Sequence, residues 1–430
     1  MTTTHRSSLP GPDDIFQATL DNGLRLFVRE NHNSPSAVIS GYLPGGAVHE
    51  PAEKAGLSAF TASMLMRGTE NRSFDEINDA VESVGASLSV YGARHAVGVG
   101  AKSLAEDFSG LLEILADVLR HPVFPDEHVA RVRGQRLTAL QERDNDTRSV
   151  ASLLMRSLAY PEDHPYHQPV EGYQKTISGL ERANLVDFYR RTYSPTGGAL
   201  VIVGAVRADD VVAQVQEALG PWQAQPAEEP ACPPVTALAS VLRREKVLPG
   251  KTQSDIVLGV PGMRRSDPQY YAARLADTVL GRFGLMGRLG EHVREQLGLA
   301  YYAYSSLTAG REPGLWSVVA GINPANVASC LAAVEEELAR LGSDLVPEEE
   351  LNDSKAFLTG SQPLQLETND GVAQAVLDMV WYDLGLDYLR QYPQLIDAVS
   401  AEEVRAVAGK YLKPGAYALA IAGPSSDGVP

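Results

Sequence analysis

Arg294 and Tyr301 are the residues of this sequence whose types and spacing best suit chemistry on a carbonyl group. Apolar residues recur at four-residue steps from Leu289 to Leu297, which predicts a helix ending at Gly298. Residues 300–308 have the composition of a β-strand. Arg294 is therefore expected in the last helical turn and Tyr301 at the start of the strand, where a chain reversal can bring the two side chains together. A guanidinium and a phenol are both hydrogen-bond donors that can hold a carbonyl oxygen or an oxyanion.

Other combinations of reactive residues are less convincing. His164 and His167 enclose Pro165-Tyr166, but no helix spaces them as metal ligands, so a structural loop is the preferred interpretation. Residues 98–103 contain glycines and a lysine without the spacing of a phosphate-binding loop. Ser63 has no base beside it and lies outside any Gly-x-Ser-x-Gly sequence, so it is a poor nucleophile candidate.

The segment from Gly56 to Thr69 predicts a helix that is buried. Leu57, Phe60 and Met64 recur at three- and four-residue steps, and Gly68 stands where a helix would end. A helix of this pattern packs its apolar face into the core and fixes the position of the residues on its other face.

The composition indicates an ordinary globular protein of about two domains. The chain has 430 residues, of which 44% are hydrophobic and 21% charged. A formal net charge of −17 disfavours nucleic acid and anionic membrane surfaces as partners. Cys232 and Cys330 lie far apart, so neither a disulfide framework nor a structural zinc site is expected. No apolar stretch is long enough to span a membrane and no signal peptide is recognisable, so we expect a cytoplasmic protein.

Periodicity predicts a mixture of strands and helices in the first half. Ser73 and Glu76 have the spacing of a capping box at the start of a helix. The expected strands are residues 16–20, 24–29, 37–43, 87–91, 96–101 and 198–203, and the expected helices are 54–67, 74–84, 104–120, 125–143, 148–160 and 185–193.

The second half of the sequence repeats the first. Residues 185–204, a helix followed by an apolar strand, are echoed by residues 404–423. Between the halves, Pro226, Pro230 and Pro233 mark an extended, stiff linker. The division expected is an N-terminal domain at 1–220, a linker at 221–236 and a C-terminal domain at 237–430.

From Phe16 to Gly423 the chain resembles the pitrilysin-like (M16, inverted-zincin) metallopeptidases, the family that includes the mitochondrial processing peptidase. The segment Arg294-Glu-Gln-Leu-Gly-Leu-Ala-Tyr301 matches the Arg and Tyr motif of that family in residue type and spacing. In its flank, Met286-Gly287 replaces the usual Ser-Ser before Arg-Leu. The resemblance implies an α+β fold of two tandem homologous domains, each a mostly antiparallel sheet with packed helices, which together form half of a clam-shell peptidase.

The same resemblance places the zinc-binding helix of the family at residues 56–69. The positions of its His-x-x-Glu-His motif are occupied here by Ala59, Ala62 and Ser63, and the position of a further glutamate ligand falls at or next to Ala139. Zinc needs imidazole, thiolate or carboxylate ligands, and a carboxylate base to take a proton from its bound water. We therefore expect no metal and no other cofactor in this chain. The zinc-site positions of its N-terminal domain are degenerate, because none of them holds a zinc ligand.

In the family, one side of the clam shell supplies zinc and the opposite side supplies the arginine and the tyrosine. This implies that Arg294 and Tyr301 act in trans, on peptide substrates, in a heterodimer with a homologous subunit that carries His-x-x-Glu-His and the zinc. The chain alone would be inactive. Spacing by itself favours a plainer interpretation, in which Arg294 caps a helix and Tyr301 packs between domains; the whole-chain resemblance favours the catalytic one.

The strand over 88–93 is a second candidate for peptide binding. In relatives, the corresponding edge strand of the zinc-bearing domain pairs with the extended substrate through main-chain hydrogen bonds. The resemblance thus implies that Val90 and Tyr91 contact a peptide, or that they only shape a cavity wall.

Three functions remain for comparison. The first is a non-zinc subunit of a heterodimeric peptidase. The second is a catalytically inactive structural, scaffolding or peptide-binding member of the same fold, in which the motifs have decayed. The third, an enzyme with its own new metal site, has the least support because no cluster of ligands replaces the lost one.

Overall fold

The computed structural model describes residues 9–424, and it divides them into two compact units. Unit 1 holds the first part of the chain and one late segment, whereas unit 2 holds most of the second half and one early segment. Unit 1 comprises residues up to 140, 169–231 and 362–391, and unit 2 comprises 141–168, 232–361 and residues from 392 onward.

A six-stranded sheet organises unit 1. Its strand order is β1-β2-β6-β3-β5-β4, in which only β2 and β6 run parallel, so that β4 forms one edge. Every residue of β6 is buried, because its alternate side chains face two different layers. The strands are β1 (Phe16–Thr19), β2 (Arg25–Glu30), β3 (Ser36–Leu43), β4 (Ser87–Gly92), β5 (Val97–Leu104) and β6 (Ala199–Gly204).

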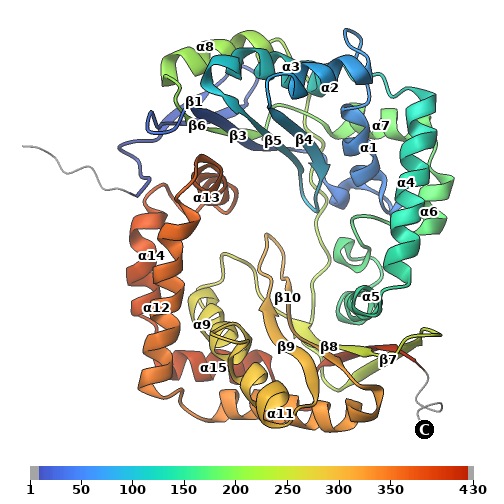
Figure 1. The fold of residues 1–430 in the computed structure, drawn as a ribbon, viewed down its shortest axis with the longest axis vertical. Helices are drawn as coiled ribbons and strands as arrows, with labels where there is room; N and C mark the ends of the chain where they lie inside the picture. Colours follow the sequence, from blue (N-terminus) through green and yellow to red (C-terminus); the bar gives the residue numbers. More distant parts are fainter. Residues whose placement is uncertain (1–8, 425–430) are drawn as a thin grey trace, which may run out of the picture. The chain divides into compact units, whose positions relative to one another are not determined.

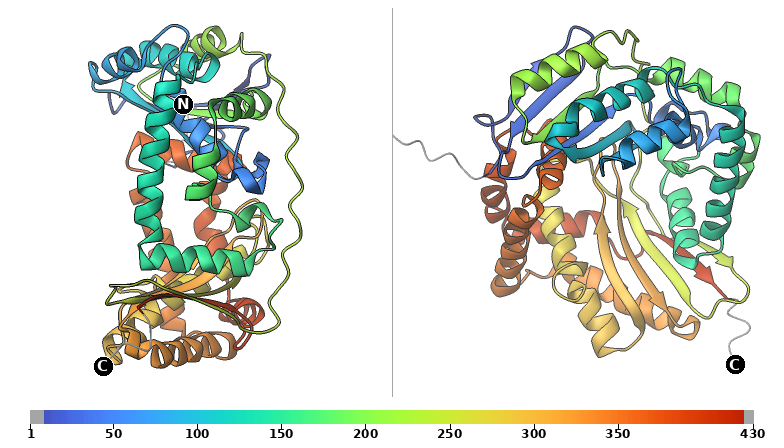
Figure 2. Two further views of the ribbon diagram at one scale, coloured as in Figure 1. Left: turned by 90° about the vertical axis from the view of Figure 1, so that its right-hand side faces the viewer. Right: turned by 45° about the horizontal axis from the view of Figure 1, so that its top comes forward.

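Helices cover both faces of this sheet (Figures 1 and 2). One face packs on α1, α3, α7 and α8 around a core that includes Phe60, Leu115 and Phe188. The other face packs on α13, whose Val372 and Val376 join Val201 of β6. The helices are α1 (Leu57–Leu65), α2 (Phe74–Glu82), α3 (Phe108–Arg120), α4 (Asp126–Asp144), α6 (Gln174–Gly179), α7 (Arg182–Thr192), α8 (Ala208–Leu219) and α13 (Asn369–Trp381), with short 3-10 turns η1 (Ala47–His49), η2 (Ala52–Lys54) and η3 (Ala105–Asp107).

The five-stranded sheet of unit 2 repeats the pairing found in unit 1. Its order, β7-β11-β8-β10-β9, corresponds to β2-β6-β3-β5-β4, and it has one parallel pair, β7 with β11, at the equivalent place. The internal duplication expected from the sequence is thus visible in the topology. The strands are β7 (Leu242–Val247), β8 (Ser254–Pro261), β9 (Ala300–Leu307), β10 (Leu315–Ile322) and β11 (Ala418–Gly423).

Unit 2 is also layered on both faces. Helices α9, α11 and α15 pack on one face of the sheet around Leu275, Val334 and Val404. Helix α5 packs on the other face, where Ala151 and Met155 meet strands β8, β10 and β11 (Figure 2). The remaining elements are α5 (Thr147–Ala159), α9 (Tyr270–Gly281), α10 (Gly287–Leu289), η5 (Gly290–Gln296), α11 (Val327–Ser343), α12 (Glu348–Gln365), α14 (Tyr388–Asp397), α15 (Ala401–Tyr411), η4 (Pro165–His167) and η6 (Pro324–Asn326).

The α+β fold of two tandem homologous domains is confirmed. The capping box of α2 is also confirmed, since Ser73 accepts the Glu76 N–H while Glu76 accepts the Ser73 N–H. The units differ from a simple division at the linker, because the segment with α5 belongs to unit 2 and the segment with α13 belongs to unit 1. Among residues 9–424, no helix is both long and apolar enough to cross a membrane.

Candidate functional site

Helix α1 carries three of the four degenerate zinc-site positions, and the two alanines among them are buried. Ala59 and Ala62 are 7% and 0% exposed. The Ser63 hydroxyl donates to the Phe60 carbonyl at 2.7 Å, which satisfies it within its own helix. Ala139, the fourth position, is an exposed residue of α4. None of the four therefore presents a side chain that could coordinate a metal ion.

An arginine occupies the neighbourhood of these positions. Arg136, three residues before Ala139 on α4, donates a hydrogen bond to the Ala59 carbonyl, and its guanidinium carbon lies 5.5 Å from the centre of the Phe60 ring. Burial lowers the pKa of Arg136 to about 10, while the carboxylates of Glu171 and Glu50 oppose that shift. The guanidinium is therefore charged at neutral pH and repels a metal cation.

The residues present do not fit zinc. Three methyl groups and one self-satisfied hydroxyl stand where zinc requires imidazoles and carboxylates, and a guanidinium lies nearby. Within the described part of the chain, no group of three His, Cys, Asp or Glu side chains is arranged to hold a metal ion. No step of a reaction can be assigned to a metal held at α1.

Glu50 closes the beginning of α1. Its carboxylate accepts the backbone N–H groups of Gly56 at 3.0 Å and Ser58 at 2.8 Å, which the first turn of the helix leaves free. Burial nevertheless raises the pKa of Glu50 to about 7, because removal from water outweighs those hydrogen bonds. Glu50 gives no recognisable signal in the sequence, since it lies outside the helix that it caps.

Strand β4 lies at the edge of its sheet and contacts α1. A Cβ on Gly92 would come within 2.6 Å of the Ala59 Cα, so the strand and the helix are in direct backbone contact. Val90 is buried, whereas Tyr91 is 53% exposed. The outer side of β4 pairs with no other strand in residues 9–424, which is the geometry that β-strand addition requires. Contact of Val90 and Tyr91 with a peptide stays a prediction.

Arg294 lies in an irregular helix. The sequence predicted a regular helix over 289–297, but the structure has a π-helix, η5, from Gly290 to Gln296. The wider turn is closed by Gly298, whose φ of 61° is easily adopted only without a side chain and whose N–H donates to the Arg294 carbonyl at 3.1 Å. The Arg294 side chain is 36% exposed and pairs with Glu295 at 3.2 Å. Short π-helical turns often occur at functional sites.

Tyr301 lies at an irregularity of the sheet. The register between β9 and β10 shifts at Gly321 and Ile322, which face Tyr302 and Ala300, so Tyr301 is the extra residue of a β-bulge. The Tyr301 side chain is 69% exposed. No hydrogen bond joins Tyr301 to Arg294 among the contacts of the described residues, so the two donors are separately available to a ligand.

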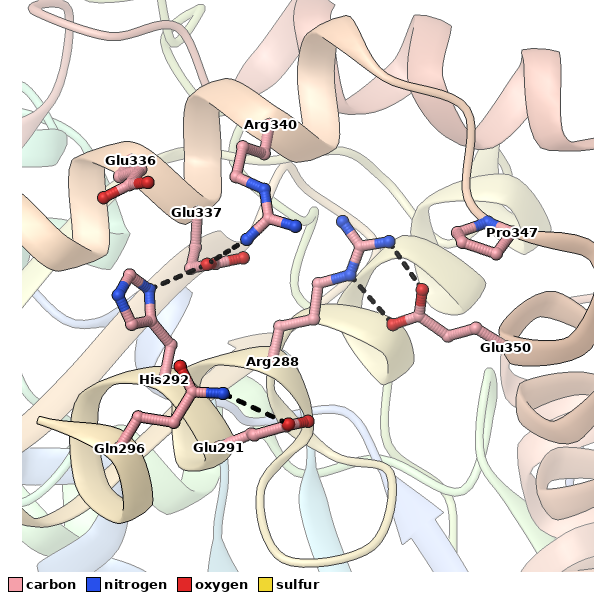
Figure 3. Close-up of a pocket in the computed structure, with 9 residues that line it drawn as sticks. All are labelled: Arg288, Glu291, His292, Gln296, Glu336, Glu337, Arg340, Pro347 and Glu350. Carbon is pink, nitrogen blue, oxygen red and sulfur yellow. Dashed lines mark hydrogen bonds and ion pairs between the residues drawn. The ribbon is translucent and has the colours of Figure 1, made fainter.

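A hollow of about 520 Å³ borders η5 on the side of α11 and α12 (Figure 3). Within it, one oxygen of the buried Glu337 accepts from His292 and from Arg340, both at 2.8 Å. Beside this cluster, Arg288 and Glu350 form a two-bond ion pair of 2.8 and 2.6 Å. The contact of His292 with Glu337 ties the π-helix to α11, and the Arg288–Glu350 pair ties the preceding α10 to α12. They link residues about 45 and 60 positions apart, so sequence spacing gave no sign of them.

The His-Pro-Tyr segment forms a structural turn. His164 is 1% exposed, stacks on Tyr160 with ring centres 5.0 Å apart, and accepts the Tyr166 N–H at 2.9 Å. His167 contacts the Tyr160 carbonyl at 2.9 Å. These contacts agree with the structural interpretation.

The fold is that of a two-domain peptidase framework, and the former zinc positions of α1, as described above, hold no side chain that could bind a metal ion. The insulinase (peptidase family M16) sequence model matches residues 25–170, and the peptidase M16 inactive domain model matches residues 179–358. The chain therefore belongs to peptidase family M16, as a member that lacks the zinc motif.

Individual relatives agree with this assignment. An uncharacterized zinc protease of Streptomyces coelicolor is 27% identical, with 97% of this chain and 91% of that protein covered. The mitochondrial-processing peptidase subunit beta of Bos taurus is 25% identical, with 94% of this chain and 83% of that protein covered. A crystal structure of a peptidase M16 inactive domain from Pseudomonas fluorescens superposes with a TM-score of 0.88 at 23% identity, covering 96% and 98% of the two chains, which shows a shared fold.

Proposed function

We propose that this chain is the non-zinc subunit of a heterodimeric zinc peptidase and supplies Arg294 and Tyr301 in trans. One observation carries the proposal: the α1 region is closed around alanines and an arginine, whereas both donors of the second motif are retained and open to solvent. A scaffold has no evident need for two exposed donors on a π-helix and a β-bulge.

The chemistry of the two side chains follows from their charge and geometry. The guanidinium of Arg294 is a permanent cation with a fork of donors, and the Tyr301 phenol is a neutral donor. Together they would hold the carbonyl of the peptide bond and stabilise the oxyanion that forms when water attacks it. Activation of that water would be the task of the homologous partner with His-x-x-Glu-His.

The test is an Arg294→Ala, Tyr301→Phe double variant assembled with that partner. Loss of an oxyanion donor costs about 3 to 4 kcal/mol, so peptide hydrolysis should fall by roughly 10²-fold or more. Size-exclusion chromatography should show unchanged assembly, and the free energy of unfolding should change by less than about 1 kcal/mol, because Tyr301 is exposed and Arg294 makes only a partly exposed ion pair with Glu295.

Glu295→Gln is the matched control, because it alters the ion-pair partner of Arg294 and leaves both donors in place. Its activity should stay within about threefold of the wild type. A double variant as active as this control would refute a role in trans.

A second candidate function is a structural or peptide-binding subunit without any role in cleavage. The open edge of β4 beside the closed α1 favours it, since that edge could hold a peptide that is never cut. Purification of the native chain separates the candidates. A near-stoichiometric partner with the zinc motif supports the peptidase, whereas an assembly without such a partner supports the scaffold.

A further inference from the structure

The guanidinium of Arg136 is built into the degenerate zinc region. One terminal nitrogen donates to the Ala59 carbonyl, so the cation lies at the first degenerate position of α1. The Phe60 ring below it, 5.5 Å from the guanidinium carbon, provides a further favourable contact for a cation. This chain thus carries no metal ligands at these positions and has a fixed positive charge in the same neighbourhood.

The donors of Arg136 are not all used. Its Nε is enclosed and has no hydrogen-bond partner, and its other terminal nitrogen makes no hydrogen bond within residues 9–424. The side chain is partly exposed, so that nitrogen can reach a ligand. Glu50 and Glu171 act on Arg136 electrostatically and keep it ionised. The Arg136 guanidinium is thus a charged donor, partly removed from water, that the backbone of α1 holds in position.

The end of β4 lies beside the residue of α1 that Arg136 contacts. Gly92, the last residue of β4, touches the backbone of Ala59, which is the residue that Arg136 contacts. A peptide paired with the edge of β4 would therefore run close to the Arg136 guanidinium. The absence of a side chain at Gly92 allows this approach between the strand and α1.

We propose that Arg136 takes the place of the metal ion as the group that binds an acceptor oxygen of an extended peptide added to the edge of β4. The acceptor is a main-chain carbonyl or a terminal carboxylate, both of which a guanidinium recognises by charge-assisted hydrogen bonds. Because a guanidinium cannot activate water as a metal does, the peptide is held and not cleaved at this position. The inference deepens the peptide-binding part of the proposed function, but it needs no partner subunit.

The experiment measures the binding of fluorescein-labelled decapeptides of mixed sequence to the isolated full-length chain by fluorescence anisotropy. Arg136→Met should weaken binding at least tenfold. The matched control is Arg133→Met, which removes a half-buried arginine one turn earlier on α4 that donates to the Leu180 carbonyl at 2.7 Å. The control should bind within twofold of the wild type.

Two further comparisons define the ligand. Peptides N-methylated at consecutive residues lose the N–H donors of both edges, cannot form a strand ladder and should bind at least tenfold more weakly. Equal affinity of free-acid and amidated peptides identifies the carbonyl as the acceptor, whereas tighter binding of the free acid identifies the carboxylate. Arg136→Lys keeps the charge and a donor for the Ala59 carbonyl but loses the planar, forked set of guanidinium donors. It should bind between threefold and tenfold more weakly. This variant tests the inference even if Arg136→Met does not fold.

Equal affinities of the Arg136→Met and Arg133→Met variants, or no peptide binding by the wild-type chain, would overturn this inference. Since no zinc-bearing partner is present, a failed assembly of the heterodimer would leave the result unaffected. Conversely, loss of the Arg136 effect would leave the role of Arg294 and Tyr301 untouched.

Discussion

The α1 region of unit 1 and the η5–β9 region of unit 2 differ in whether their polar side chains are bonded within the protein or accessible to solvent. Around α1, the degenerate positions are alanines or a self-bonded serine, and the nearby charges of Glu50 and Arg136 are bonded to backbone groups. At η5 and β9, irregular backbone presents Arg294 and Tyr301 to solvent. The α1 positions have become part of the core, with Arg136 beside them only partly exposed, whereas η5 and β9 keep Arg294 and Tyr301 within reach of solvent.

The largest effect is expected where β4 touches α1. Gly92→Ala should lower the free energy of unfolding by about 3 kcal/mol, because its Cβ would meet the Ala59 backbone, which cannot rotate away. Denaturant unfolding measures the change. In the matched control, Gly100→Ala on β5, the new methyl would meet only the Ser89 hydroxyl at 3.0 Å, which can move. Equal stabilities of the two variants would mean that the α1 region is not closed.

A smaller effect is expected from Glu50 as the pH rises. Its pKa of about 7 in the folded state lies above the usual carboxyl value, so the folded state is favoured at low pH and loses stability as pH rises toward 7. Relative to Glu50→Gln, the wild type should lose about 2 kcal/mol of unfolding free energy between pH 5 and pH 8. Parallel pH profiles for the two proteins would show that Glu50 is not buried as described.

The smallest change in stability is expected beside η5. Glu337→Gln weakens the charge-assisted contacts to His292 and Arg340, which should cost about 1 to 2 kcal/mol. If the chain acts in trans as proposed, peptidase activity of the heterodimer should also fall, because the π-helix that carries Arg294 is less firmly held. The control is Glu336→Gln at an exposed position of the same helix. If both variants keep full activity, the Glu337 cluster does not position Arg294.

Local signals in the sequence predicted much of this fold. The repeat of residues 185–204 at 404–423 corresponds to β6 and β11, which occupy equivalent places in the two sheets. The Ser73 capping box and the strand around Val90 were also predicted correctly, because each depends on neighbouring residues. The position of that strand at the sheet edge was implied by the family resemblance.

Long-range features could not be predicted in the same way. The contacts of Arg136 with Ala59 and of Glu337 with His292 join residues 77 and 45 positions apart, and neither pair leaves a pattern in the sequence. The π-helix was missed because Leu289, Val293 and Leu297 satisfy an ordinary helical period. One feature of the sequence could have indicated Arg136. It lies one helical turn before Ala139, so the position of the lost carboxylate ligand has a basic residue close to it.

The exchange of α5 and α13 between the units has a consequence for the gene. A reading frame that stopped in the proline-rich linker would encode the first sheet without α13, leaving the apolar face around Val201 uncovered. The complementary fragment would lack α5 and expose Val257 and Ala420 on its sheet. Neither fragment is a complete folding unit, although the linker separates the two sequence repeats. Each sheet therefore obtains its full cover only when both halves of the chain are present.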